Sequence, residues 1–126
     1  MIVFQNKILF GHGTFLASVT CGSGSGEIQS VAPEAEIIAV KLKRAREYYY
    51  ERLLIPEEIE TVYQTTDLML GIEYIIEKAR ELNMPVSICI GVGTNHGGHD
   101  GFTEIERYIS TVSNMTGVCI STAARK

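Results

Sequence analysis

The clearest periodic pattern in the chain lies between residues 66 and 83, where apolar side chains recur every three or four positions. These apolar positions are Leu68, Ile72, Ile75, Ile76, Ala79 and Leu82. The spacing places them on one face of a helix, because an α-helix repeats every 3.6 residues. Asp67 stands where it can cap the start of this helix, and Asn83 and Pro85 stop it. The pattern predicts a long helix that packs one face on a core.

Two shorter helices are predicted on either side of this one. The first begins at His12, and its core-facing positions are Leu16, Val19 and Cys21. The other begins near Thr103, which is followed three residues later by Glu106 in the pattern of a capping box. Its apolar stripe consists of Ile105, Ile109 and Val112.

Apolar runs of strand length separate the predicted helices, at residues 36–42, 86–90 and 118–120. The run at residues 36–42 is nearly continuous, which is typical of a strand covered on both faces. A further run at residues 8–10 is predicted to pair as an edge strand. Strands that alternate with helices form parallel sheets through right-handed crossovers. The chain is therefore predicted to have an α/β fold with three layers around a parallel sheet.

Residues 43–64 interrupt this alternation with a polar, charged segment that is longer than most loops. A short helix is predicted at residues 56–60. Basic and aromatic residues gather in the first half of the segment 43–64 and just before it. They are Lys41, Lys43, Arg44, Arg46, Tyr48, Tyr49, Tyr50 and Arg52. Such residues can stack on nucleic-acid bases, but Glu47 and Glu51 lie among them and three more glutamates follow. We interpret the segment as a solvated surface of mixed charge.

The composition of the chain bears on which classes of molecule it binds and on the state of its cysteines. The 126 residues carry a net charge of −4, which disfavours nucleic acid and anionic membranes. No apolar run approaches the roughly 20 residues of a membrane-spanning helix, and no signal segment opens the chain. The three cysteines, Cys21, Cys89 and Cys119, are widely spaced within apolar runs, so buried free thiols are expected rather than disulfides.

Three places along the chain are candidates for chemistry. His12 stands between two glycines, and an imidazole can accept a serine proton at neutral pH and return it to a leaving amine. Residues 91–93, Gly-Val-Gly, follow a predicted strand and leave room for another backbone to approach. His96, His99 and Asp100 offer zinc ligands, but their glycine-rich loop gives no helical face to hold them. No metal site and no cofactor are expected.

The order of the motifs resembles the region around the catalytic histidine of the subtilisin-like serine proteases, the subtilases. Residues 11–14 read Gly-His-Gly-Thr, residues 31–33 read Val-Ala-Pro, and the following strand ends in Val-Lys. The resemblance implies that His12 is the general base and that Gly91, Val92 and Gly93 pair with an extended protein or peptide substrate. It also implies that residues 43–64 form one wall of the substrate cleft.

Within this family, Gly-Thr-Asn at residues 93–95 and His-Asp-Gly at residues 99–101 most resemble the clostridial spore-germination branch. Members of that branch process the precursor of a cortex-lytic enzyme. This resemblance implies a location in the cytoplasm or inside the spore.

Other parts of the family's pattern are missing. Both aspartates, Asp67 and Asp100, follow His12, whereas the catalytic aspartate of subtilases precedes the histidine, and the Gly-Thr-Ser motif of the nucleophile is absent. Further departures from the pattern are Phe15 in place of histidine, Ser18 and Ser30 in place of glycine, and Arg125-Lys126 in place of the Gly-Asn that stabilises the oxyanion.

Residues 1–126 are therefore expected to be the central part of a subtilase catalytic domain, with only the histidine of the Ser-His-Asp triad, and to be inactive alone. The alternative is a pseudoprotease-like module that binds a protein through the same cleft edge. A three-stranded parallel sheet without its neighbours has open edges, which predicts a homo-oligomer.

Overall fold

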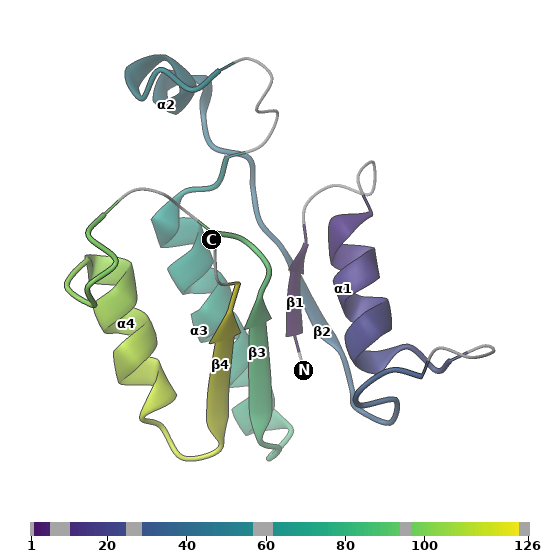
Figure 1. Cartoon of the computed structure of the whole chain (residues 1–126). Coiled ribbons are helices and arrows are strands. Elements are labelled where there is room, and N and C mark those ends of the chain that lie inside the picture. The colour runs from purple at the N-terminus through teal and green to yellow at the C-terminus, as the bar shows by residue number, and fades with distance from the viewer. Residues whose placement is uncertain (1, 6–10, 25–28, 57–61, 94–96, 124–126) are drawn as a thin grey trace.

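The computed structural model describes residues 2–5, 11–24, 29–56, 62–93 and 97–123. The elements of this part of the chain follow one another as β1 (Ile2–Gln5), α1 (His12–Cys21), β2 (Ile38–Lys41), α2 (Glu47–Arg52), α3 (Thr65–Glu81), β3 (Val86–Ile90), α4 (Glu104–Ser113) and β4 (Val118–Thr122). The four strands form one sheet in the order β2-β1-β3-β4, and every pair is parallel (Figure 1). The predicted α/β class is confirmed.

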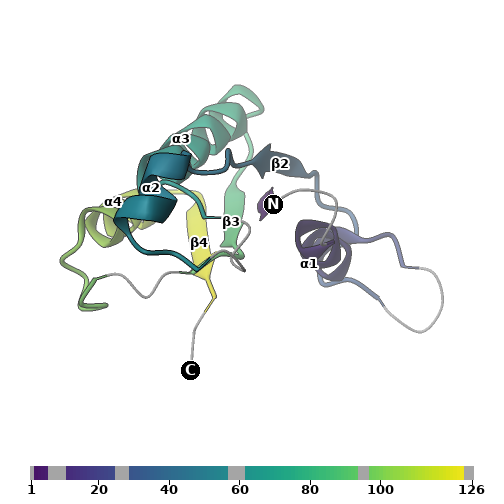
Figure 2. The ribbon, with the colours of Figure 1, turned by 90° about the horizontal axis from the view of Figure 1, so that it is seen from above.

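The elements form three layers. Helices α3 and α4 lie on one face of the sheet, and α1 lies on the opposite face beside β1 (Figure 2). Because all strands are parallel, the carboxyl ends of β1, β2 and β3 meet at the same edge, where α1 and α3 begin (Figure 1). On the α1 side, Ser87, Cys119 and Ser121 of β3 and β4 are exposed. The described helices therefore cover this face of the sheet only in part.

The main core lies between the sheet and α3. Ile72 and Ile75 of α3 and Ile88 of β3 are fully buried. The other buried members of this cluster are Leu42, Ile76, Ala79, Val86, Ile90 and Val112. The predicted stripe of α3 supplies four of these contacts with the sheet, which confirms the helical period. Leu82, at the end of the stripe, is half exposed because it is the C-cap residue.

The predicted ends of three elements agree with the structure. Strand β3 spans the predicted residues 86–90. The hydroxyl of Thr103 accepts a hydrogen bond from the backbone N–H of Glu106, and the carboxylate of Glu106 accepts one from the backbone N–H of Thr103, which completes the capping box of α4. The hydrogen bonds that the Thr103 hydroxyl and the Thr103 backbone N–H donate to the Glu106 carboxylate lower the pKa of this carboxyl. Gly117, with φ of 81°, makes the turn into β4.

Two predictions about the strands and helix ends were wrong, and a third is not tested. An edge strand was predicted at residues 8–10, which lie outside the described residues; the first strand of the structure lies at Ile2–Gln5, inside the sheet between β2 and β3. Strand β2 alternates between half-buried and exposed positions, because α1 does not extend over all of its second face. The N-cap of α3 is Gln64, so Asp67 lies in the first helical turn.

Two predictions about buried side chains also need correction. Val19 is 42% exposed, since it lies on the outer face of α1. The three cysteines form no disulfide with one another, but only Cys21 is buried; Cys89 is half-buried and Cys119 is exposed on the partly covered face of the sheet.

We expect Ile75→Ala to lower the free energy of unfolding by about 2–5 kcal/mol, because it leaves a cavity in the core. Leu70→Ala is the matched control on the same helix: Leu70 is 62% exposed, so its truncation should change stability by about 0.5 kcal/mol or less. Urea unfolding followed by circular dichroism measures both. Equal losses for the two variants would contradict the assignment of the core.

Candidate active site

His12 begins α1 at the carboxyl edge of the sheet. The N-cap residue, Gly11, has φ of 63°, a left-handed conformation that glycine adopts without the steric penalty of a side chain. The next residue in the motif, Gly13, is buried, whereas the imidazole of His12 is exposed. The two glycines thus allow a tight helix start that leaves the histidine accessible.

The imidazole of His12 reaches the first residue after β3. Its Nε2 atom lies 3.0 Å from the carbonyl oxygen of Gly91, although the two residues are 79 positions apart. A carbonyl oxygen only accepts hydrogen bonds, so Nε2 is the donor of this one. Sequence reasoning proposed both residues as candidates from separate motifs, and the structure brings them together.

Gly91 permits this approach because it has no side chain. A Cβ atom at this position would clash with Cδ1 of Leu16 and would lie 3.4 Å from Nε2 of His12. His12 and Leu16 are four residues apart, so they occupy the same face of α1, and this face packs on Gly91. The contribution of Leu16 was missed by sequence reasoning, which assigned it only to a core.

The other two residues of the predicted substrate edge differ from Gly91. Val92 is half-buried and packs against the main core. Gly93 is exposed, and a Cβ atom there would have nothing within 4 Å. The edge therefore consists of one glycine in contact with the histidine, one residue anchored to the core, and one open position.

The predicted metal candidates do not form a cluster in the described part of the chain. His99 and Asp100 lie in an exposed loop, where a carboxylate oxygen of Asp100 accepts a hydrogen bond of 3.2 Å from the backbone N–H of Phe102. His96 lies outside the described residues, and no group of three potential ligands is found among the others. Likewise, no described Asp or Glu side chain bonds to His12.

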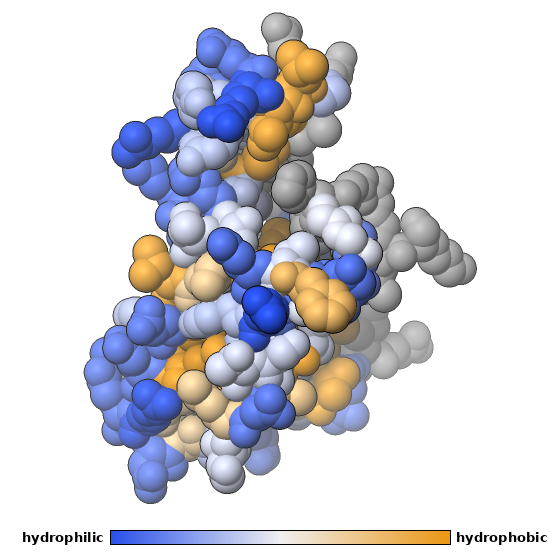
Figure 3. Space-filling model, turned by 90° about the vertical axis from the view of Figure 1, so that its left-hand side faces the viewer, coloured by the Kyte–Doolittle hydropathy of each residue, from blue (hydrophilic) through white to orange (hydrophobic). Residues whose placement is uncertain are grey.

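Residues 43–56 form a small lobe around α2 that projects from the carboxyl edge of the sheet (Figure 1); we call it the α2 lobe. Its helix lies at Glu47–Arg52, where none was predicted, and most of the predicted helix at residues 56–60 lies outside the described residues. Figure 3 shows an apolar strip on this lobe beside strongly hydrophilic side chains. The most exposed of its large apolar residues are Tyr48, Leu53 and Leu54.

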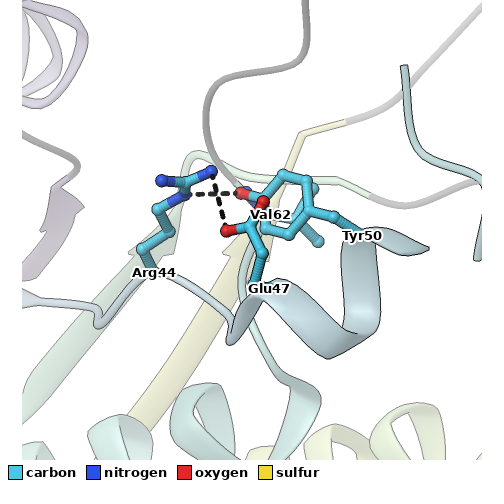
Figure 4. A network of polar contacts seen from close by, with 4 residues as sticks. All are labelled: Arg44, Glu47, Tyr50 and Val62. Carbon is cyan, nitrogen blue, oxygen red and sulfur yellow. Dashed lines mark hydrogen bonds and ion pairs between the residues drawn. The ribbon is translucent and has the colours of Figure 1, made fainter. Parts of the chain in front are cut away.

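The α2 lobe is held by Tyr50 (Figure 4). The Tyr50 hydroxyl accepts hydrogen bonds from the backbone N–H of Val62, at 2.8 Å, and from Nε of Arg44, at 3.1 Å. The guanidinium of Arg44 also lies over the Tyr50 ring, 4.6 Å from its centroid, and forms a 3.7 Å ion pair with Glu47. The cluster of tyrosines and arginines is visible in the sequence, but its spacing does not show that the Tyr50 hydroxyl bonds with the backbone of Val62, which lies twelve residues later and just before α3.

Comparison with known proteins found a solved structure that is similar to this one. The chain superposes on part of the CspB protease of Clostridium perfringens with a TM-score of 0.76 and 29% sequence identity. The match covers 94% of this chain and 24% of that protein, so the chain spans about a quarter of its length. No protein-family model and no curated protein sequence matches. Among the described residues, no helix is long and apolar enough to cross a membrane.

Gly91→Ala should destabilise the chain by about 1–3 kcal/mol, because the added methyl group overpacks the contact with Leu16. Gly93→Ala is the matched control, since it adds the same methyl group where nothing lies within 4 Å. Denaturant unfolding of both variants gives the difference. A Gly91→Ala variant as stable as Gly93→Ala would show that α1 does not pack on the end of β3.

The fold and the comparison agree on the broad identity of the chain: an α/β structure of the predicted kind that is similar to part of a protease.

Proposed function

We propose that this chain is the central part of the catalytic domain of a subtilisin-like serine endopeptidase. His12 would be the general base, and the catalytic aspartate and serine would come from other segments of the complete protein. The observation that carries the proposal is the contact between His12 and Gly91, which joins the proposed base to the proposed substrate edge. The similarity to a protease supports it.

The proposed reaction follows from the chemistry of the imidazole. A serine hydroxyl that attacks a peptide carbonyl gives its proton to the histidine, which passes it to the leaving amine. An extended peptide pairs its main chain with Gly91, Val92 and Gly93, in the manner of an added strand. Burial of Val92 against the core holds this edge in place, and the α2 lobe forms a wall beside it. The substrate is a protein or peptide, and germinating spores are the proposed setting.

A pseudoprotease-like module is the second candidate. The observation in its favour is that His12 bonds with a backbone carbonyl and, among the described residues, with no carboxylate. Such a module would bind a protein through the same edge without cleaving it. The two candidates differ in whether His12 supports turnover in a complete domain.

A chimera tests the proposed function. Residues 11–123 would replace the matching quarter of the C. perfringens CspB protease, and peptide hydrolysis would be measured for the chimera, for its His12→Ala variant and for a His99→Asn control. We expect activity in the chimera and the control, and a fall of about 10⁶ in turnover for His12→Ala, as for the loss of the histidine in subtilisin. His99 has φ of 52°, which asparagine tolerates.

Circular dichroism and thermal unfolding would establish that each chimera is folded. A folded chimera without activity would favour the pseudoprotease-like module. Activity that persists in His12→Ala would exclude His12 as the base.

The chain alone should show no hydrolysis above background. It has no aspartate before His12 and no nucleophile motif, and a triad that lacks its serine loses about 10⁶ in turnover. The purified chain would be incubated with an activated ester and a peptide substrate. Hydrolysis that His12→Ala abolishes would contradict this prediction, whereas hydrolysis that survives this substitution comes from a contaminant.

We also propose that the isolated chain forms a homo-oligomer. Strands β2 and β4 are the edges of the sheet, and open edges pair with other chains. Cys119→Asp places a charge on the partly covered face and should shift the population toward monomer. Sedimentation equilibrium in reducing buffer measures both forms, and a monomer at every concentration of the unsubstituted chain would refute the proposal.

A further inference from the structure

We propose that Gly91 holds His12 in a resting state in which its Nε2 atom cannot act as a base. This inference rests on the proposed function, because it describes how the proposed base is controlled. The carbonyl of Gly91 accepts a hydrogen bond from Nε2 and so keeps this nitrogen protonated. This resting state lasts until a carboxylate accepts a hydrogen bond from Nδ1. Gly91 is thus a positioning residue for His12.

The position of the proton follows from the contact itself. The Gly91 oxygen has no hydrogen to give, so Nε2 must carry one across the 3.0 Å separation. In a neutral imidazole the lone pair is then on Nδ1, and in the imidazolium form both nitrogens are protonated. In neither form can Nε2 take a proton from a serine hydroxyl.

Nothing in the described part of the chain favours the opposite tautomer. A carboxylate that accepts a hydrogen bond from Nδ1–H would fix the proton there and leave the lone pair on Nε2. His12 has no such partner among the described residues, and its polar contact is with the Gly91 carbonyl. Among the described residues, the contact with Gly91 therefore favours the tautomer with the proton on Nε2.

Packing of α1 on Gly91 maintains the contact. Leu16, one turn after His12, lies against the Cα side of Gly91 at a distance that leaves no space for a Cβ atom. The hydrogen bond and the packing thus act on the same face of α1. A Cβ atom at position 91 would force Leu16 to move and would lie 3.4 Å from Nε2 of His12, so we expect it to disturb the contact between Nε2 and the carbonyl oxygen.

Nuclear magnetic resonance tests the proposal without any measurement of hydrolysis. The chain would be labelled with ¹⁵N in its three histidines and with ¹³C in its glycine carbonyls, and His12→Ala would assign the His12 signals. We expect a slowly exchanging Nε2–H proton at His12 and a coupling across the hydrogen bond from Nε2 to the Gly91 carbonyl carbon. Both signals should persist in Gly93→Ala and disappear in Gly91→Ala.

Leu16→Ala is a second variant, which removes the packing of Leu16 on Gly91 and leaves residue 91 unchanged. It should speed exchange of the Nε2–H proton several-fold and shift the His12 signals while the spectrum of the sheet is retained. The proposal is overturned if a folded chain shows Nε2 without a proton, or if its Nε2–H proton exchanges as fast as that of exposed His99.

The same measurement on the chimera, with its aspartate and serine in place, should show the proton on Nδ1 instead. A proton that remains on Nε2 in an active chimera would also overturn the proposal. An inactive chimera would count against the proposed function, whereas the proton position in the isolated chain would still stand as measured.

Discussion

The hydrogen bond between His12 and Gly91 connects the two parts of the structure to which we assign the proposed chemistry. His12 belongs to the helix on one face of the sheet, and Gly91 directly follows β3, a strand whose other face packs on α3. The contact requires that β3 ends at the edge where α1 begins, which a parallel sheet with helices between its strands provides. Glycine at position 91 also lets Leu16 occupy the space that a side chain there would take. One short contact thus depends on topology, on packing and on a single residue type.

The two faces of the sheet differ in how completely they are covered. On the α3 side, fully buried isoleucines such as Ile72, Ile75 and Ile88 form a continuous core. On the α1 side, serine and cysteine side chains of β3 and β4 remain exposed. A stable core on one face can hold β3 and its following edge in place while the other face stays open to further protein. This arrangement agrees with a chain that spans about a quarter of its structural neighbour.

Much of the fold was predictable because local signals and burial agree. Local sequence patterns were enough to predict three elements. These patterns are the apolar stripe of α3, the capping box of Thr103 and Glu106, and the short apolar run of β3. The sequence was less informative where tertiary structure decides. The place of β1 inside the sheet depends on pairing with distant strands, and α2 depends on the long-range bond of the Tyr50 hydroxyl. For the site, His12 and Gly91 were named from motifs, but the role of Leu16 came only from the fold.

The most direct test of this account is the distance between the two segments in solution. Nuclear Overhauser effects would be sought from the ring protons of His12, and from the methyl groups of Leu16, to the Hα protons of Gly91. The account predicts both, since the ring and the methyl group each lie at the site that a side chain of residue 91 would occupy. A folded chain that shows neither effect would contradict it.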